Sequence, residues 1–504
     1  MLFRRLKMIV TINIEMTIYK AQILIIASIL VLFTRFVQSQ SIVTYITPAE
    51  IKKSDRYEIL VRVPGDTNWQ QVEVQTAKVN VRNLSKSGRC AFANFDASFS
   101  RGIDIKVQTK SAIMQNVVVR PRNEGITFIK GRNFIQFTIH KAQKLSIELD
   151  NDRLNNLFIF ANDLESNIPD KNDPNIIYLG PGVHKAENIK IKNGQTIYLN
   201  GGALVQGSIN VYNKKDLTIR GRGILNGEIL NHDRSKTRPN LLKFKNGKNI
   251  TIDGITLIDS PVWSLFIDNC EQVNIRNVKI FGHMINADGI TLSQSKNINI
   301  ADCFIRSADD NISIKSLNGN PTLDILIKNS TLWADDAHNM LIGPESKGAT
   351  YRNIRFKNIA VLENTQKVGM YSGVMSIMAS DKANVSDVHW DDISIEDITA
   401  GEIIRLNYTK VHSVDKDDYG SDIRDIYFSN IQYNGTSATP GTIKGVDGAR
   451  TIRNVSIRNF KFNKDPVQVG TASNNTRSRA LKSTSVRTPA ISVNKFVERM
   501  TIIE

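Results

Sequence analysis

The chain has 504 residues, of which 41% are hydrophobic and 23% charged, and its formal net charge is +16. The composition is ordinary for a globular protein with a real core, and the length predicts one large domain or two. The basic balance favours acidic partners such as uronic-acid polymers, cell walls or membrane faces, with improved solubility as the alternative. Lys and Arg form no compact patch with interleaved aromatic residues, which argues against nucleic-acid binding.

The first predicted element is a signal peptide over residues 1–39. The apolar run AQILIIASILVLF at 21–33 follows Lys20 and is too short for a membrane-spanning helix. A start at Met16 gives a tidier signal than the first methionine, and a single membrane anchor is the alternative. Removal of the signal leaves a charge of about +12. We therefore expect a secreted or periplasmic protein with no stable membrane insertion.

The pattern of residues 41–167 is typical of short antiparallel strands. The segments RYEILVRV, QQVEVQTAKVNV, IDIKVQT, QFTIH and KLSIEL alternate apolar and polar residues with a period of two, and turn residues separate them. Several such strands at near-regular spacing predict an antiparallel β-sandwich. The polar, proline-bearing stretch at 165–175 is a credible linker.

Residues 175–490 carry an irregular repeat. Segments such as NITIDGITL and INIADCFI contain a short strand, a polar corner and a second short strand. Repeats of roughly 20–40 residues without helical patterns predict the stacked coils of a parallel β-helix, with insertions in the loops of one binding face. Aligned on the last apolar residue of the first strand, the coils step by 23 to 38 residues through Ile219, Ile252, Ile275, Ile300, Ile327, Phe356, Trp390, Phe428 and Ile457, with Leu199 as an earlier rung.

Three cysteines, Cys90, Cys270 and Cys303, are widely spaced. An odd number at this spacing is neither a disulfide framework nor a metal motif. We expect three buried thiols, with a bridge between Cys270 and Cys303 as the alternative.

Three acids stand out in the coils: Asp288, Asp309 and Asp310. With coils of about 20–25 residues, the 21-residue step from Asp288 to Asp309 places both at the same corner of adjacent coils, about 5 Å apart. Crowded like charges make one carboxyl hold a proton near neutral pH, as a general acid needs, while its neighbours activate water. Such carboxylates hydrolyse glycosidic bonds. Turn-capping acids and a calcium site are the alternatives.

Five motifs together resemble those of the polygalacturonases. NADG (286–289) is similar to their Asn-x-Asp motif, ADDN (308–311) to Gly-Asp-Asp, and AHNMLIG (337–343) lies where they carry Gly-His-Gly. GRGILNG (221–227) and SPVW (260–263) match the usual run-up, and the order and spacing agree over about three-fifths of the chain. A sandwich ahead of the coils is similar to the dextranase and isopullulanase relatives in the same clan.

The resemblance implies a right-handed parallel β-helix and hydrolysis with inversion. It implies that Asp309 is the general acid, that Asp288 and Asp310 activate the water, and that His338 positions groups near the acid. The candidates for substrate binding are His338, Asn286, His283 and Arg405.

The chain departs from the family where the substrate carboxylate is gripped. Polygalacturonases carry Arg-Ile-Lys on a later strand, whereas Met375, Ser376 and Ile377 stand there in this sequence. Losing a bidentate cation removes affinity and specificity for a carboxylate. Arg405 in the next coil is the candidate replacement. The local site therefore slightly favours a neutral glucan, although the net charge favours an acidic polymer.

Other polar and aromatic residues near the motifs receive structural interpretations. Asp335 and Asp336 are read as corner or calcium-like acids rather than catalysts. Trp263 and Trp333 are expected to pack in the interior rather than to stack on sugars.

The sequence thus predicts an inverting polysaccharide hydrolase that acts as a monomer without metal or cofactor, with a pectin-acting polygalacturonase as the alternative. A non-catalytic glycan-binding β-helix is a second class, against which three repelling acids argue. A β-helical polysaccharide lyase is the third, and it would need a Lys or Arg base and calcium-binding acids. We expect deletion of residues 41–165 to weaken stability or solubility more than the chemistry, because the three acids lie outside that segment.

Overall fold

The computed structural model places most of the chain in strands. The only described helices are short 3-10 turns, so the predicted all-β fold is confirmed. The signal peptide predicted over 1–39 lies outside the described residues. Within the described part of the chain, no helix is long and apolar enough to cross a membrane. The structure describes residues 41–110, 113–369, 372–412, 418–471 and 489–504.

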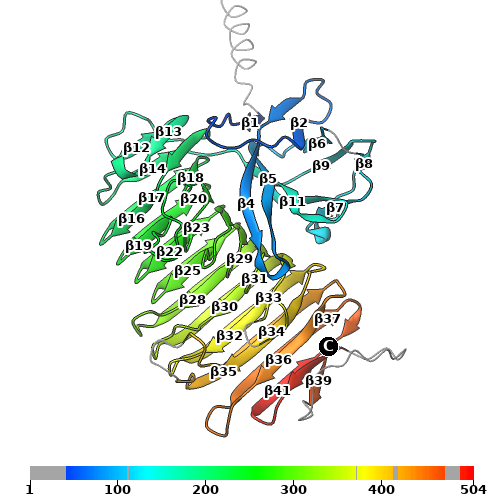
Figure 1. Ribbon diagram of the computed structural model, residues 1–504, viewed down its shortest axis with the longest axis vertical. Helices are drawn as coiled ribbons and strands as arrows, with labels where there is room; N and C mark the ends of the chain where they lie inside the picture. Colours follow the sequence, from blue (N-terminus) through cyan, green and yellow to red (C-terminus); the bar gives the residue numbers. More distant parts are fainter. Residues whose placement is uncertain (1–40, 111–112, 370–371, 413–417, 472–488) are drawn as a thin grey trace, which may run out of the picture. The chain divides into compact units, whose positions relative to one another are not determined.

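Two sheets make up the N-terminal sandwich (Figure 1). One is antiparallel, in the order β3-β2-β6-β9-β8. In the other, β4 pairs with β5, and β11, β10 and β7 follow β5; the β5–β11 pair is parallel, whereas the β4–β5, β10–β11 and β7–β10 pairs are antiparallel. The strands are β1 (Ile42–Thr44), β2 (Tyr57–Arg62), β3 (Gln70–Val72), β4 (Val74–Val81), β5 (Lys86–Ala97), β6 (Ile103–Thr109), β7 (Val117–Arg120), β8 (Ile129–Lys130), β9 (Phe134–Ile139), β10 (Gln143–Leu149) and β11 (Asp152–Asp163), with turns η1 (Arg82–Leu84) and η2 (Arg122–Glu124).

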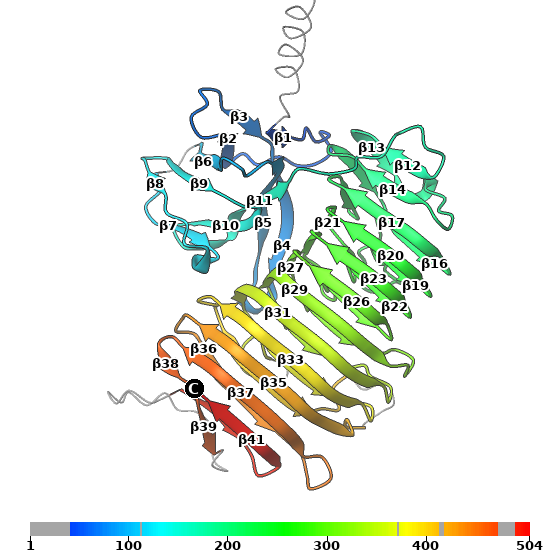
Figure 2. The same ribbon diagram turned by 180° about the vertical axis from the view of Figure 1, so that it is seen from behind.

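From β12 onward the chain winds into the predicted right-handed parallel β-helix (Figures 1 and 2). The first column of parallel strands contains β12 (Ile176–Leu179), β14 (Thr196–Leu199), β17 (Lys215–Gly221), β20 (Lys248–Asp253), β23 (Glu271–Arg276) and β26 (Lys296–Ala301). The second contains β13 (Gly182–Lys185), β15 (Ala203–Gln206), β18 (Ile224–Asn226), β21 (Thr256–Ile258), β24 (Lys279–Gly282) and β27 (Phe304–Ser307), with η3 (Ala186–Asn188) after β13.

In the later coils, long strands continue the first two columns together, because β29 pairs with both β26 and β27. These strands are β29 (Thr322–Ala334), β31 (Thr350–Asn364), β33 (Asn384–Ile395), β35 (Asp422–Tyr433) and β37 (Ile452–Phe462), followed by β38 (Asp465–Pro466) and β41 (Val497–Ile503). The third column contains β16 (Ile209–Tyr212), β19 (Leu242–Lys245), β22 (Leu265–Asp268), β25 (Ile290–Ser293), β28 (Ile312–Lys315), β30 (Met340–Ile342), β32 (Met375–Ala379), β34 (Gly401–Tyr408), β36 (Ala438–Lys444), β40 (Ala490–Val493) and β39 (Gln468–Thr471).

The predicted rungs stack in register inside this helix. Each predicted residue from Ile219 to Ile457 pairs with the next one in the series. Leu199 is the exception, because Ile197 is the residue opposite Ile219. Late in this apolar column, three rings stack: the ring centroid of Trp390 lies 5.5 Å from that of Phe356 and 4.8 Å from that of Phe428. Burial of this column supplies the main hydrophobic stabilisation of the coils.

Asparagines account for many of the corners between columns. Asn213, Asn246 and Asn269 have positive φ values of 54°, 55° and 52°. Asn tolerates this left-handed region because its short side chain hydrogen-bonds locally. Here the amides also form a ladder, in which Asn269 donates to Asn246 (2.8 Å) and Asn246 donates to Asn213 (2.9 Å).

A second apolar core joins the N-terminal sheet to the outside of the β-helix. Phe92 packs on Phe281 with ring centroids 5.1 Å apart, and Phe158 packs on Phe304 at 4.6 Å. Trp333 belongs to the same cluster and is 1% exposed, which confirms its predicted packing role. The strands of the second column are therefore buried on both faces, which explains their near-continuous apolar sequences.

All three cysteines are buried and free. The expectation of buried thiols is confirmed, and the alternative bridge between Cys270 and Cys303 is wrong. Cys270 lies in the interior of the β-helix, where its thiol lies 3.3 Å from the carbonyl of Asp268. Burial raises the pKa of the Cys270 thiol to about 11, so it stays protonated.

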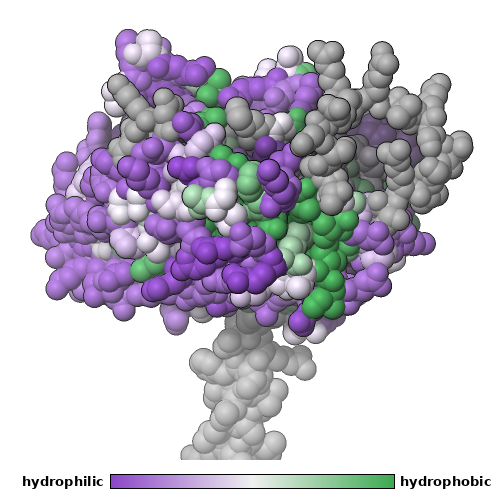
Figure 3. All heavy atoms as spheres, turned by 90° about the horizontal axis from the view of Figure 1, so that it is seen from below, coloured by the Kyte–Doolittle hydropathy of each residue, from purple (hydrophilic) through white to green (hydrophobic). Residues whose placement is uncertain are grey.

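The C-terminal coils leave some apolar surface uncovered. Viewed from below, apolar residues form a green area between hydrophilic ones (Figure 3). Among the described residues of the last strands, Val469 is 45% and Ile503 is 48% exposed. Terminal repeats of a stacked fold have a neighbour on one side only, so partial exposure is expected there.

Candidate active site

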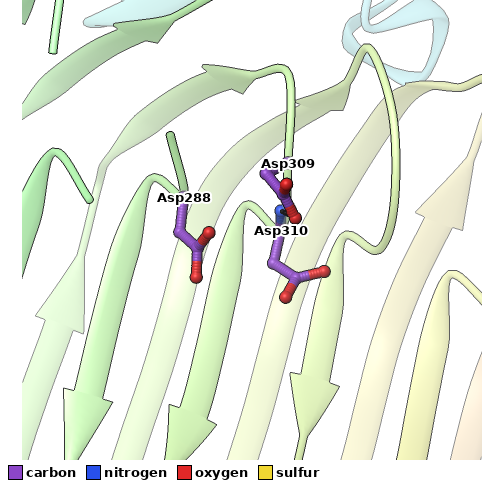
Figure 4. A group of neighbouring side chains, drawn as sticks. All are labelled: Asp288, Asp309 and Asp310. Atoms are coloured by element: carbon purple, nitrogen blue, oxygen red, sulfur yellow. Dashed lines mark hydrogen bonds between the residues drawn. The ribbon is translucent and has the colours of Figure 1, made fainter. Parts of the chain in front are cut away.

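The three acids lie just before neighbouring strands of the third column. Asp288 precedes β25 and Asp310 precedes β28, and Figure 4 shows their carboxylates side by side with that of Asp309. Because Ile290 pairs with Ile312, the residue in register with Asp288 is Asp310 and not Asp309. The acids lie on adjacent coils, as predicted, but this coil is one residue longer than the 21-residue step from Asp288 to Asp309 on which the prediction was based.

The carboxylates are close and largely shielded from water. One oxygen from each lies within 4.8 Å of the others. Asp288 is 2% and Asp310 1% exposed, whereas the side chain of Asp309 is 14% exposed. The backbone N–H of Asn286 donates to Asp309 (3.0 Å), and the hydroxyl of Thr291 donates to Asp288 (3.2 Å). Asp309 is thus the member of the group best placed to meet a ligand.

His338 fixes the charge of Asp310. Its Nδ1 lies 2.8 Å from Asp310 Oδ1, and its backbone N–H donates to the same oxygen (3.2 Å). Burial works against ionisation of Asp310, but these hydrogen bonds outweigh it and lower its pKa below the ordinary value. Asp310 is therefore the member of the group most firmly held as a carboxylate.

The environment of Asp288 and Asp309 shifts both pKa values upward, towards the protonated form. Burial raises the pKa of Asp309, the charge of Asp310 raises it further, and Arg82 opposes both. Burial also raises the pKa of Asp288, while Lys315, with its Nζ 3.4 Å from Asp288 Oδ2, opposes the shift. The Lys315 ammonium also contacts Glu345 at 2.7 Å. The site therefore combines carboxyls whose pKa is raised with one whose pKa is lowered, which is the pairing that acid–base catalysis needs.

A cavity of about 490 Å³ opens over the acids. Asp288, Asp309 and Asp310 line it together with Asn286, and among the described residues its Lys/Arg side chains are Arg82, Arg234, Arg238 and Lys315. Trp263 also lines the cavity, and Lys315 lies 4.9 Å from the centre of its ring. The cavity thus offers Trp263 as an aromatic face for a sugar, against the expectation that this residue packs in the interior.

Three predicted substrate-binding residues, His283, Arg405 and His338, lie outside the cavity lining. His283 Nδ1 lies 3.4 Å from Asp259, and burial lowers the pKa of His283 to about 4, which keeps it neutral. Arg405 Nη1 donates to Glu402 at 2.9 Å, and this pair does not line the cavity either. His338 lies behind Asp310, fully buried, and acts on that carboxylate rather than on a ligand.

The two acids set aside in the sequence are ion-pair partners. Asp335 pairs with Arg306 at 2.8 Å, and both are 1% exposed. Asp336 pairs with Arg82 at 3.0 Å. Neither lines the cavity, in agreement with their exclusion from catalysis.

The three carboxylates are the group in the described chain whose spacing would suit a metal ion. However, Lys315 already places a positive charge against Asp288. An ammonium at this position competes electrostatically with a divalent cation, so the cluster by itself does not make a metal site.

Sequence reasoning missed the cations of the site. Lys315 stands two residues after Ser313 on a strand whose alternate residues, Ile312 and Ile314, face the interior. The alternation of side chains along this strand would have placed Lys315 on the outer face of the β-helix, which is where the structure has it. No such signal marks the arginines of the cavity. Arg82 comes from a distant hairpin, and Arg234 and Arg238 come from an irregular loop.

A comparison with protein-family models matches residues 172–478, more than half of the chain, to glycosyl hydrolases family 28. The chain is 28% identical over 216 residues to an exopolygalacturonase of Arabidopsis thaliana, covering 41% of this chain and 46% of that protein. It is 29% identical over 249 residues to a polygalacturonase of Nicotiana tabacum, covering 46% and 59%. The chain spans about half the length of these curated relatives.

Among solved structures, Dex49A from Penicillium minioluteum is similar over 91% of this chain and 96% of its own, with a TM-score of 0.64. Sequence identity is 13%, so this likeness concerns the fold. It extends over more of the chain than the family match and includes the N-terminal segment.

Proposed function

The chain belongs to glycosyl hydrolases family 28, and from this premise we propose that it hydrolyses O-glycosidic bonds of a polysaccharide with inversion. The observation that carries the proposal is the group of three carboxylates at the cavity, one of them exposed enough to reach a ligand and one tied to His338. The polygalacturonase names of the relatives support the same class of substrate. A glycan-binding role alone would give no use for the repulsion within the group.

In the proposed reaction, Asp309 donates its proton to the glycosidic oxygen as the bond to the anomeric carbon breaks. Asp310, ionised through its contact with His338, accepts a proton from water, and the water oxygen bonds to the anomeric carbon. Asp288 orients that water, with Lys315 beside it. Protons balance, because Asp309 loses one and the Asp310 side gains one before both return to their resting states.

The spacing of the acids bears on the stereochemical outcome. Most inverting glycosidases hold acid and base about 6.5–9.5 Å apart, which leaves room for water between them. Here the nearest oxygens lie within 4.8 Å. The proposal of inversion rests on the family, and it requires that the attacking water binds to one side of Asp309, between Asp288 and Asp310. Proton NMR of the first products decides it, and a product with the substrate's anomeric configuration would replace inversion by a glycosyl-enzyme route.

We expect a bell-shaped dependence of kcat/KM on pH. The raised pKa of Asp309 means that its proton, and with it activity, is lost as pH rises through that pKa. The lowered pKa of Asp310 means that the carboxylate is lost only at pH values below the ordinary 3.8. Initial rates between about pH 3 and 9 test this. Activity that climbs steadily into the alkaline range would instead indicate the Lys or Arg base of a lyase.

The nature of the sugar has two candidates. Met375, Ser376 and Ile377 are buried and provide no cation, which favours the neutral glucan. Arg238 favours an acidic sugar, because it lines the cavity and donates to neutral groups: the carbonyls of Pro261 (2.6 Å) and Ile285 (2.9 Å) and the amide oxygen of Asn286 (3.2 Å). We keep the neutral glucan as the first candidate and polygalacturonate as the second.

A substrate panel distinguishes the candidates. We expect the purified protein to release reducing ends from dextran or pullulan faster than from polygalacturonate, in moderate salt and with a chelator present. Faster cleavage of polygalacturonate that disappears in Arg238→Gln would assign the cavity to a uronate. Unsaturated products that require calcium would replace hydrolysis by a lyase reaction, and the absence of any cleavage would contradict the enzyme proposal.

We also propose that the protein is exported and that its chain forms two structural parts. The apolar run at 21–33 supports export and a secreted or periplasmic site of action. Strand pairing supports a sandwich over 41–167 and a β-helix over 175–490, and we propose that the protein acts as a monomer.

A further inference from the structure

The N-terminal sheet sends a hairpin to the acids. Strands β4 and β5 pair antiparallel up to Val81 and Lys86, and η1 (Arg82–Leu84) closes the hairpin. In both ribbon views the hairpin runs alongside the β-helix (Figures 1 and 2). Arg82 at its tip lines the cavity over the acids. A segment expected to act as support thus contributes a side chain to the site.

The β-helix holds the hairpin tip through Asp336. This carboxylate is 1% exposed and accepts the backbone N–H groups of Arg82 (2.9 Å) and Asn83 (3.1 Å), as well as the Arg82 Nε–H (3.0 Å). The Asn83 amide donates to Gln366 at 2.9 Å. Charge-assisted hydrogen bonds from three donors to one buried carboxylate fix the start of η1 firmly.

The other end of the same guanidinium lies against the acid. Arg82 Nη2 donates to the carbonyl of Ala308 (3.0 Å) and lies 3.6 Å from Asp309 Oδ2. That distance is too long for a hydrogen bond but short enough for a strong charge interaction. The same Asp309 oxygen accepts the backbone N–H of Asn286 (3.0 Å). The planar fork of an arginine can span such a pair of sites, which a lysine cannot.

We propose that Arg82 is a positioning residue of the glycoside-cleaving site, which orients Asp309 through Ala308 and supplies the nearest positive charge to its carboxyl. The N-terminal sheet therefore completes the active site. The inference rests on the proposed function and adds a residue to it.

The groups that face Asp309 define the expected effect. Asp288 and Asp310 disfavour its ionised form, and Arg82 and Lys315 favour it. Removing the charge of Arg82 raises the pKa of Asp309, so the proton of the acid survives to higher pH. The alkaline limb of the rate profile should then move upward, by about 0.5–1 pH unit because the Arg82 side chain is 32% exposed and partly screened.

The test compares pH–rate profiles of the full chain carrying Arg82→Gln, Arg82→Lys or Arg89→Gln. Arg89 lies on the same hairpin, donates to Thr76 (3.2 Å) and lies outside the cavity lining, so it is the matched control. For Arg82→Gln we expect the upward shift and a roughly tenfold lower kcat at the optimum, since the acid loses its orientation. In Arg82→Lys the alkaline limb should lie close to its position in the parent chain, but kcat should stay below the parent value. Arg89→Gln should match the parent chain in both.

Asp336→Asn gives a second measurement of opposite sign. The asparagine keeps an oxygen for the hairpin N–H groups but removes the negative charge that compensates Arg82. Arg82 then stabilises ionised Asp309 more strongly, so the alkaline limb should move to lower pH. If Arg82 had a merely structural role, Arg82→Gln and Asp336→Asn would both lower the rates, but they would not move the alkaline limb in opposite directions. An active parent chain whose alkaline limb coincides with that of Arg82→Gln would overturn this inference alone, whereas an inactive parent chain would contradict the proposed function.

Discussion

Asp309→Asn is expected to lower kcat by about 10²–10⁴-fold, and by more for substrates with a poor leaving group, while the fold stays intact. The amide has the shape of the carboxyl and can still accept the N–H of Asn286, but it has no acidic proton to give to the leaving oxygen. At pH values where Asp309 is ionised, the substitution also removes its repulsion with Asp310, so the free energy of unfolding should stay the same or rise. Initial rates and urea unfolding of the same preparation measure both effects.

Asp302→Asn is the matched control for that experiment. Asp302 lies at a corner between β26 and β27 with φ of 56°, outside the cavity lining, and Asn tolerates this conformation well. We expect unchanged rates. Parent-like turnover in Asp309→Asn would remove this residue from the role of general acid and would shift attention to Asp288, the other carboxyl whose pKa is raised.

Much of the fold could be predicted because the coils repeat one apolar pattern. Every coil needs an interior residue at the same place, so Ile, Phe and Trp mark the register along the chain. The number of residues in a corner cannot be recognised from a comparable pattern. The apolar alternation carries no information on how many residues turn between β24 and β25 or between β27 and β28, and this is why Asp310 rather than Asp309 lies in register with Asp288.

The site was predictable where one short segment carries it. Asp288, Asp309 and Asp310 lie on successive coils, so their meeting follows from stacking alone. Arg82 comes from a hairpin whose docking depends on Asp336, far away in the sequence, and no local pattern signals that contact. Arg405 shows the converse limit, because its proximity in sequence to the expected carboxylate-binding strand did not bring it into the cavity.

The core that docks the N-terminal sheet explains why residues of two segments depend on one another. Phe158 stacks edge-on to Trp333 at 5.5 Å, and Arg306 lies 4.7 Å from the Trp333 ring. The backbone carbonyl of Trp333 accepts a hydrogen bond from the Asn311 amide (3.0 Å), and Asn311 follows Asp310 directly. Packing between the sheet and the β-helix therefore also supports the strand that presents the acids.

Trp333→Ala should accordingly destabilise the protein by about 3–5 kcal/mol, the range found for removing a fully buried aromatic ring. The loss combines buried apolar area with the Nε1–H donated to Asp335 (2.9 Å), which leaves that buried carboxylate with fewer donors. Urea unfolding, followed by the shift of the first transition, measures the cost. Trp69→Ala is the control for the same substitution, because Trp69 is only partly buried and packs against Arg62 at the surface, so we expect a cost below about 1 kcal/mol. Trp333→Phe should retain most of the packing. Equal costs for Trp333→Ala and Trp69→Ala would show that the sheet and the β-helix are not held together by this aromatic cluster.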